Sequence, residues 1–318
     1  MADLEKYLGR TAFAVGTGRC GTSFVYKLLT HEGGIASFHE KNIFAECFHR
    51  YAQWYELPVD ARAFLQTKQA DIAQALTHSE FYFEASAPLS HSVDALYEAF
   101  GSRFILFIRD PIKVVDSYLK KGWYELPIEL DDFHKAPGYN PNHLQSHHTF
   151  SRIAPRGEHF GDWDRMGRPG KLGWFWSVAN QTILDSFDRI PRENSLVVRL
   201  EDYTYDSYLE MLNFLARKSS MDRNTFESIV RSKPNRSPEK VKAYEWSEGD
   251  WSEFVSQVEV LATRFNYRLD KPGFIAARNN EQAGSVARQP STLDRYKNAL
   301  RKAKRAFFKE LDSGAVGE

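Results

Sequence analysis

Cysteine is scarce in this sequence, and neither sign of charge is in excess. Cys20 and Cys47 are the two cysteines among 318 residues, too few for a disulfide framework and consistent with a reducing compartment. Lysine plus arginine and aspartate plus glutamate each number 42, so the formal net charge is zero. An overall basic surface is therefore excluded, we expect no nucleic-acid partner, and any anion site must be a local cluster of residues.

Long apolar runs and internal repeats are also absent. No run approaches the roughly 20 residues that a membrane span needs, and the opening MADLEKYLGR lacks the apolar core of a signal peptide. We therefore expect a cytoplasmic protein with no membrane span. A hydrophobic share of 42% supports either one large α/β domain or two small ones.

Four short runs, rich in β-branched or aromatic residues, have the character of buried strands. They span 11–15, 81–85, 103–108 and 195–200, and helix-like stretches include 23–29 and 111–121. Asp110 is the expected N-cap of the helix that starts at Pro111. Strands alternating with helices predict an α/β fold with a central, mainly parallel sheet flanked by helices. Such sheets bind ligands at the carboxyl ends of their strands.

Two segments differ in composition from the rest. Residues 122–172 are rich in Gly, Pro, His and Trp with little periodicity, and Trp123 and Trp163 favour a substrate-facing lid over a linker. From residue 279 the chain is polar and then reads STLDRYKNALRKAKRAFFKEL, a basic amphipathic helix. A solvated terminal helix is the simplest interpretation, and contact with an anionic surface or a partner is the alternative. We therefore expect one domain over 1–278 and a linker with a basic helix over 279–318.

The stretch AVGTGRCGTSF (14–24) resembles a nucleotide phosphate loop that lacks its lysine. Its glycines fit the spacing of GxxxxGK[ST], but Thr22 stands where that pattern requires lysine. A glycine-rich turn between a strand and a helix points backbone N–H groups and the positive helix end at one anion. Arg19 adds a planar fork that suits a tetrahedral oxyanion without a metal. A glycine turn with a surface arginine is the alternative. The residues expected to hold the anion are Gly18, Arg19, Cys20, Gly21, Thr22 and Ser23.

A second motif, FILFIRDPIKVVDSYLKKG (104–122), places Arg109 at a strand end and Ser117 in the following helix. Together with the Arg19-Cys20-Gly21-Thr22-Ser23 loop, it resembles the sulfotransferases that use PAPS, 3′-phosphoadenosine 5′-phosphosulfate. Members of that family carry a loop of the type [KR]-S-G-T-[ST] and a later R-D-P-x5-S-Y segment. The resemblance implies a P-loop-NTPase-like sulfotransferase fold. It also implies that the loop holds the 5′-phosphosulfate, and that Arg109 and Ser117 hold the 3′-phosphate.

Three further segments extend the resemblance. VVRLEDY (197–203) looks like a strand end of the family, and YFEASAPL (82–89) looks like the family segment near the acceptor. RSKPNRS (231–237) lies where many members have a basic loop over the nucleotide, so Arg236 could supplement the 3′-phosphate site, or the segment is a solvated basic turn. Cys20 departs from the family serine. A thiol beside Arg19 at a helix start is expected to have a lowered pKa, although a small residue filling the turn is the simpler interpretation.

Transfer to a hydroxyl requires positive charge on the leaving phosphate, a catalytic role expected of Arg19 and the helix end, and a group that takes the acceptor's proton. IASFHEKN places Glu40 near the position of a catalytic glutamate in several sulfotransferases, including the tyrosylprotein and trehalose types, and His39 is its neighbour. Members acting on small phenols and steroids use a histidine that lies much nearer the R-D-P motif. The resemblance therefore favours Glu40 over His39 as the base. An effective base would have Glu40 partly buried with its pKa raised.

Four residues are expected to contact the acceptor: Glu84, Ser86, Trp123 and His147. The alternatives are an ion pair of Glu84 with an arginine, a turn that starts at Ser86, and solvent exposure of His147. His143, His147 and His148 have a spacing that could ligate a metal, but no Cys or carboxylate completes a set, and we expect no metal.

The sequence thus predicts a metal-independent enzyme that moves the sulfuryl group from PAPS to a hydroxyl, or as second choice an amine. The acceptor would be a small molecule or a carbohydrate, and self-association into a homo-oligomer is left open. Two alternatives remain: a P-loop kinase-like phosphotransferase with a degenerate loop, and a non-catalytic nucleotide-binding protein of the same fold.

Overall fold

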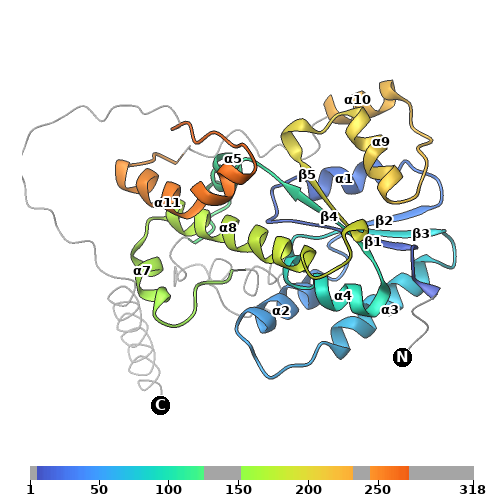
Figure 1. Ribbon diagram of the computed structural model, residues 1–318, viewed down its shortest axis with the longest axis horizontal. Helices are drawn as coiled ribbons and strands as arrows, with labels where there is room; N and C mark the ends of the chain where they lie inside the picture. The colour runs from blue at the N-terminus through green and yellow to red at the C-terminus, as the bar shows by residue number, and fades with distance from the viewer. Residues whose placement is uncertain (1–5, 125–151, 232–243, 272–318) are drawn as a thin grey trace, which may run out of the picture.

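The computed structural model describes residues 6–124, 152–231 and 244–271, and a five-stranded parallel sheet forms its centre (Figure 1). The strands follow the order β2-β3-β1-β4-β5, so β1 lies between β3 and β4. This confirms the predicted α/β fold with a parallel central sheet. The strands are β1 (Thr11–Val15), β2 (Ile35–His39), β3 (Phe81–Ala85), β4 (Arg103–Ile108) and β5 (Ser195–Arg199).

Helices cover both faces of the sheet (Figure 1). One face carries α1 (Thr22–Leu29), α9 (Tyr205–Phe214) and α10 (Arg223–Arg231). The other face carries α2 (Ile43–Trp54), α3 (Arg62–Ala75), α4 (Val93–Phe100), α5 (Pro111–Leu119), α8 (Arg168–Phe187) and α11 (Glu248–Arg264).

The core consists of two hydrophobic clusters, one on each face of the sheet. Phe13 and Val15 of β1 pack into the cluster with α4, α5 and α8, whereas Ala12 and Ala14 pack into the cluster with α1 and α9. Successive side chains of a strand point to opposite faces, and every residue of β1 is buried. A strand buried on both faces has the nearly continuous apolar sequence that TAFAV shows.

The predicted elements agree closely with the observed ones. β1, β3 and β4 have the expected bounds, while β5 ends at Arg199 because Leu200–Asp202 form a 3₁₀ turn. The Asp110 carboxylate caps α5 by accepting a hydrogen bond from the Ile112 N–H at 2.8 Å. β2 was not predicted, because it is an edge strand in which only Ile35 is buried and no apolar run marks it.

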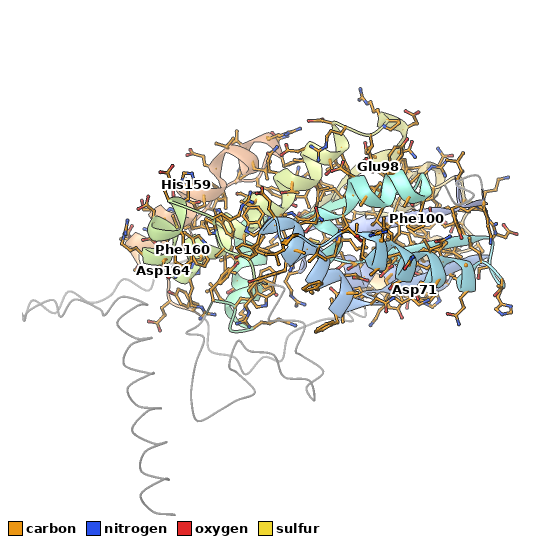
Figure 2. The ribbon with its side chains drawn as sticks, turned by 90° about the horizontal axis from the view of Figure 1, so that it is seen from below. Asp71, Glu98, Phe100, His159, Phe160 and Asp164 are labelled. Carbon is orange, nitrogen blue, oxygen red and sulfur yellow. The ribbon has the colours of Figure 1, made fainter. Side chains whose placement is uncertain are left out.

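Parts of the chain that carry expectations lie outside the described residues. These are 125–151 with His147, 232–243 with Arg236, and the tail from 272. The described remainder of 122–172 includes α7 (His159–Arg165) and the start of α8. Figure 2 shows α7 at the end of the molecule away from α3 and α4. None of the described helices combines the length and the apolar character that a membrane crossing requires.

Candidate active site

Two loops meet at the carboxyl edge of the sheet because β1 and β4 are adjacent parallel strands. The glycine-rich loop follows β1, and Arg109 follows β4. Neighbouring parallel strands end at the same edge, where open α/β sheets bind their ligands. The two motifs of the sequence are therefore brought side by side by the pairing of their strands.

The two motifs contact each other directly. Arg19 Nε donates a hydrogen bond to Ser117 Oγ at 2.8 Å, and Arg109 Nη1 donates one to the Arg19 carbonyl oxygen at 2.8 Å. Arg19, Arg109 and Ser117 are all partly exposed, so their polar groups reach the surface of this edge. The contacts place a guanidinium from each motif and a hydroxyl in one cluster that suits a phosphate-bearing ligand.

The loop itself fits an anion. Gly21 is the N-cap of α1 with φ 107°, and among the described residues no side chain caps this helix end. The Phe24 N–H donates to the Gly21 carbonyl oxygen at 2.9 Å, so the N–H groups at the very start of the helix are those that suit another acceptor. Thr22 is 4% exposed, whereas Ser23 is partly exposed on the same turn. A negatively charged group at this position would meet the positive end of α1.

Tyr118 contacts the glycine-rich loop and restricts its shape. Its hydroxyl donates a hydrogen bond to the Thr17 carbonyl oxygen, and a Cβ at Gly18 would lie 2.5 Å from the same hydroxyl. Gly18 also has φ 81°, a left-handed backbone conformation that residues other than glycine rarely adopt. The close approach of Tyr118 therefore requires glycine at position 18.

The R-L-E-D segment after β5 supports Arg109. Glu201 Oε1 lies 4.0 Å from Arg109 Nε and accepts a hydrogen bond from the Asp110 N–H at 3.2 Å. Trp176 Nε1 donates to the Arg109 carbonyl oxygen at 3.0 Å. Backbone and side chain of Arg109 are thus held by two different elements.

The expectation of a lowered thiol pKa at Cys20 is wrong. Cys20 is 0% exposed, and burial raises the pKa of its thiol. Its Sγ fills the turn, since a Cβ at Gly16 would lie 2.5 Å from it. Cys20 therefore contributes its backbone and its volume to the loop.

Glu40 stands just beyond the end of β2, on a tight turn. Its N–H donates to the Ala85 carbonyl oxygen at 3.1 Å, which extends the β2–β3 ladder by one bond, and its φ is 48°. The side chain is 29% exposed. Burial raises the pKa of the Glu40 carboxyl, against the opposing positive charge of Arg50. A partly exposed carboxylate with a raised pKa has the properties of a general base.

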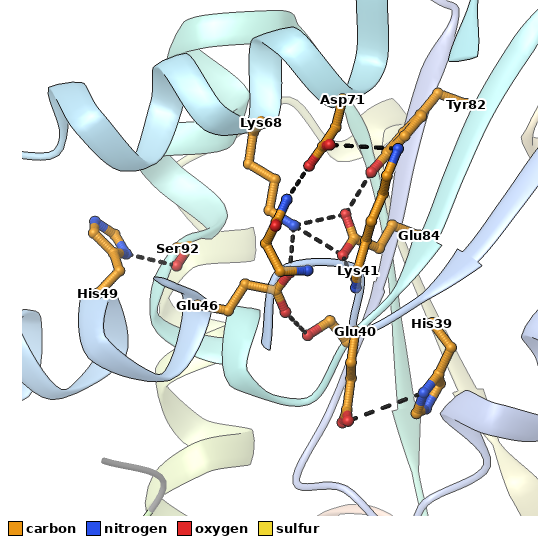
Figure 3. A network of polar contacts seen from close by, with 12 residues as sticks. His39, Glu40, Lys41, Glu46, His49, Lys68, Asp71, Tyr82, Glu84 and Ser92 are labelled. Carbon is orange, nitrogen blue, oxygen red and sulfur yellow. Dashed lines mark hydrogen bonds and ion pairs between the residues drawn. The ribbon is translucent and has the colours of Figure 1, made fainter. Parts of the chain in front are cut away.

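His39 faces the glycine-rich loop. His39 Nε2 and Ser23 Oγ form a hydrogen bond at 2.8 Å, whereas His39 Nδ1 lies 4.0 Å from Glu40 Oε2 (Figure 3). Burial lowers the pKa of His39, so the ring is neutral near pH 7. The end of β2 therefore places His39 against the glycine-rich loop and Glu40 next to His39.

The expected acceptor residues within the described chain are buried. Glu84 and Ser86 are 0% exposed and Trp123 is 6% exposed. Glu84 forms an ion pair with Lys68, where an arginine was expected as the alternative partner, and Ser86 Oγ donates to Glu46. The Trp123 ring packs on Tyr118 with centroids 4.2 Å apart. Their burial favours supporting roles beneath Glu40 and the loop over direct contact with an acceptor.

Lys68 and Glu46 were missed by the sequence analysis. Both side chains are 0% exposed and they form an ion pair. A signal was available for Lys68, because Phe64, Lys68 and Ile72 share one helix face at a spacing of four residues, and all three are buried. A lysine on the apolar face of a helix indicates a buried partner of opposite charge.

Metal ligands do not gather in the described part of the chain. Within residues 6–124, 152–231 and 244–271, no group of three or more His, Cys, Asp or Glu side chains could hold a metal ion. The three histidines at 143, 147 and 148 lie outside those ranges.

Comparison with known proteins places the fold. A scan against protein-family models and a search of the curated proteins each found no match. Among solved structures, the sulfotransferase STF9 from Mycobacterium avium is 13% identical over 83% of this chain and 78% of its own, with a TM-score of 0.50. The sulfotransferase domain of the Synechococcus PCC 7002 olefin synthase is 14% identical, over 82% of this chain and 95% of its own, with a TM-score of 0.40. The sulfotransferase domain from the curacin biosynthetic pathway is 15% identical, over 81% and 98%, with a TM-score of 0.41. The likeness to STF9 shows that the chain has the fold of a sulfotransferase.

Proposed function

We propose that the chain is a sulfotransferase that moves the sulfuryl group from PAPS to a hydroxyl of a small molecule or carbohydrate, with an amine as the second choice. The observation that carries this proposal is the pair of hydrogen bonds that join Arg19 to Ser117 and Arg109 to the Arg19 carbonyl oxygen. A nucleotide with phosphate groups at both its 5′ and 3′ positions needs two adjacent anion sites, and these contacts bring together the two motifs that would provide them.

In this proposal the glycine-rich loop binds the 5′-phosphosulfate of the donor. Arg19, the first-turn N–H groups of α1 and Ser23 would hold the phosphosulfate oxygens, and the helix end would stabilise the charge that develops on the leaving phosphate. Arg109 and Ser117 would hold the 3′-phosphate. No step of this scheme calls for a metal ion, since fixed positive groups supply the charge.

The acceptor side falls to Glu40. The acceptor oxygen attacks sulfur in line with the leaving phosphate oxygen, the new S–O bond forms, and the old one breaks with its electron pair on the phosphate. Glu40 takes the proton of the attacking hydroxyl, a role that its raised pKa and partial exposure support. The products are the sulfated acceptor and 3′,5′-ADP.

His39 has a different role in this proposal. A neutral ring with the proton on Nε2 donates to Ser23 Oγ, so the Ser23 hydroxyl hydrogen can turn to a phosphate oxygen. His39 would thus orient a donor-binding hydroxyl, and Glu40 alone would act as the base. Of these two adjacent residues, His39 would therefore act on the sulfate donor and Glu40 on the acceptor.

Incubation of the chain with PAPS labelled in its sulfate and with a panel of phenols, steroids and sugars tests the proposal. We expect transfer of label to at least one hydroxyl compound, release of 3′,5′-ADP, and a rise in melting temperature with 3′,5′-ADP. Stabilisation by ATP with Mg²⁺ and none by 3′,5′-ADP would favour the kinase-like alternative. Stabilisation by 3′,5′-ADP without transfer to any acceptor class would favour a non-catalytic nucleotide-binding protein.

A further inference from the structure

A cluster of charged side chains lies fully buried beneath the turn that carries Glu40 (Figure 3). Lys68 Nζ of α3 contacts both carboxylate oxygens of Glu84 of β3 at 2.8 Å and also bonds Glu46 of α2. All three side chains are 0% exposed. Charges buried this deeply are retained only when they are paired and hydrogen-bonded.

The cluster also holds backbone groups of the turn. The Lys41 N–H donates to Glu84 Oε1 at 3.0 Å, and the Asn42 N–H donates to Glu46 Oε1 at 3.1 Å. These are the two peptide groups that directly follow Glu40, whose φ of 48° bends the chain out of the strand direction. A residue in this conformation persists only when the surroundings determine it.

The two carboxyl groups also accept hydrogen bonds from neutral hydroxyl groups. The Tyr82 hydroxyl donates to Glu84 Oε2 at 2.6 Å, and the Ser86 hydroxyl donates to Glu46 Oε2. Although burial opposes it, the Lys68 ammonium lowers the pKa of Glu84, whereas burial and the neighbouring Glu84 raise the pKa of Glu46 to about 8. The carboxylates are therefore fixed points to which the turn is bound.

We propose that Lys68, Glu46 and Glu84 are positioning residues, which hold the turn of residues 40–42 so that the Glu40 carboxylate is fixed at the edge of the sheet. The holding of the turn stands on the contacts alone, and its effect on turnover rests on the proposed function. None of the three touches the reacting atoms in this proposal.

Two variants of Glu84 separate the contact from the bulk of the side chain. Glu84→Leu removes the acceptor of the Lys41 N–H, whereas Glu84→Gln keeps an oxygen there. We expect hydrogen exchange of a peptide spanning 38–44 to be about tenfold faster in Glu84→Leu and within about threefold of the original in Glu84→Gln. Equal exchange rates in both variants and the original protein would overturn the proposal.

Glu32→Gln is the matched control, because Glu32 is also a buried carboxylate, 4% exposed, but it bonds Ser219 and Ser220 far from the turn. It is expected to lower the melting temperature without changing exchange at 38–44. Faster exchange at 38–44 in this control would show a general loss of stability and overturn the specific role.

Turnover supplies the second readout. If the proposed function holds, Glu84→Leu lowers kcat by about 100-fold through misplacement of the base, with the KM for PAPS and the affinity for 3′,5′-ADP nearly unchanged. A faster exchange with no sulfate transfer by the original protein would support the holding of the turn and count against the proposed function alone. Should Glu84→Leu fail to fold, Tyr82→Phe removes one hydrogen bond from Glu84, and unchanged exchange in that variant overturns the proposal.

Discussion

Arg19 Nε and Ser117 Oγ are joined by a hydrogen bond of 2.8 Å across 98 positions of sequence. One residue lies in the loop after β1 and the other in α5, which follows the neighbouring strand β4. A phosphate group that bound to Arg19 would therefore lie close to Ser117 as well. The hydrogen bond joins the two motifs that the proposed function assigns to one nucleotide.

Ser117→Ala is expected to weaken binding of 3′,5′-ADP by about tenfold, because a hydroxyl to a charged phosphate and the partner of Arg19 are both lost. Binding of 5′-AMP, which lacks the 3′-phosphate, should change less. Calorimetric titration with both nucleotides measures the two effects. Ser256→Ala on the exposed side of α11 is the control. Equal weakening of both nucleotides would place Ser117 outside the 3′-phosphate site.

Glu40→Gln is expected to lower kcat by about 100- to 10,000-fold, the range typical of a lost general base. The affinity for 3′,5′-ADP should be preserved, because Glu40 faces the acceptor side in the proposed mechanism. Steady-state turnover with labelled PAPS and titration with 3′,5′-ADP separate the two. Unchanged kcat would remove Glu40 from the role of base.

The raised pKa of Glu40 also has a consequence for stability. The folded protein favours the protonated carboxyl, so the contribution of Glu40 to stability is fully present below its unfolded pKa, near the ordinary 4.5. It is lost as the pH rises through the raised folded value. Glu40→Gln should therefore match the original protein in melting temperature near pH 4 and exceed it increasingly as the pH rises above the unfolded value. A series of melting curves over this range measures the difference, and a difference that shrinks with rising pH would contradict the shift.

His39→Ala is expected to act on the donor rather than on the chemical step. Loss of the bond to Ser23 Oγ should raise the KM for PAPS by about five- to tenfold, with a smaller change in kcat than Glu40→Gln. Saturation curves in PAPS at fixed acceptor separate the two parameters. A loss confined to kcat would instead indicate that His39 is the base, which was the alternative to Glu40 in the sequence.

Gly18→Ala is expected to distort the phosphate loop, since the added Cβ meets the Tyr118 hydroxyl at 2.5 Å and φ is 81°. The strain amounts to about 1–2 kcal/mol for the left-handed conformation alone. The double variant Gly18→Ala/Tyr118→Phe removes the hydroxyl and should recover part of the lost stability and nucleotide binding. Tyr118→Phe alone is the control for the lost bond to Thr17. No recovery in the double variant would show that backbone conformation, rather than Tyr118, demands the glycine.

The parts of the fold that the sequence predicted are those governed by local pattern. TAFAV, FYFEA and RFILFI are mostly apolar because their strands are buried on both faces, and the Asp110-Pro111 pair marks a helix start. β2 escaped prediction because an edge strand that is mostly half-buried needs no apolar run. The place of each motif at the end of a strand predicted that both loops lie at the carboxyl edge of the sheet, whereas the pairing of β1 with β4 that makes them neighbours was not predicted.

The parts of the site that stayed hidden depend on tertiary packing. The pKa of Cys20 depends on burial of the thiol inside the turn, which outweighs its place beside Arg19. Glu84 reads as a strand-end carboxylate near the acceptor, and only the packing of α3 on the sheet reveals Lys68 as its partner. Charged residues on separate elements carry no signal in sequence for which pairs will meet.

The residues proposed for the two substrates stand on different parts of the sheet. The loop and Arg109 follow the interior strands β1 and β4, whereas Glu40 follows the edge strand β2. The end of β2 nevertheless joins the two, because His39 bonds Ser23 Oγ of the loop and the turn after Glu40 bonds the buried Glu84 and Glu46 of α2. A change of acceptor specificity around this turn therefore has to leave the contact between His39 and the glycine-rich loop intact.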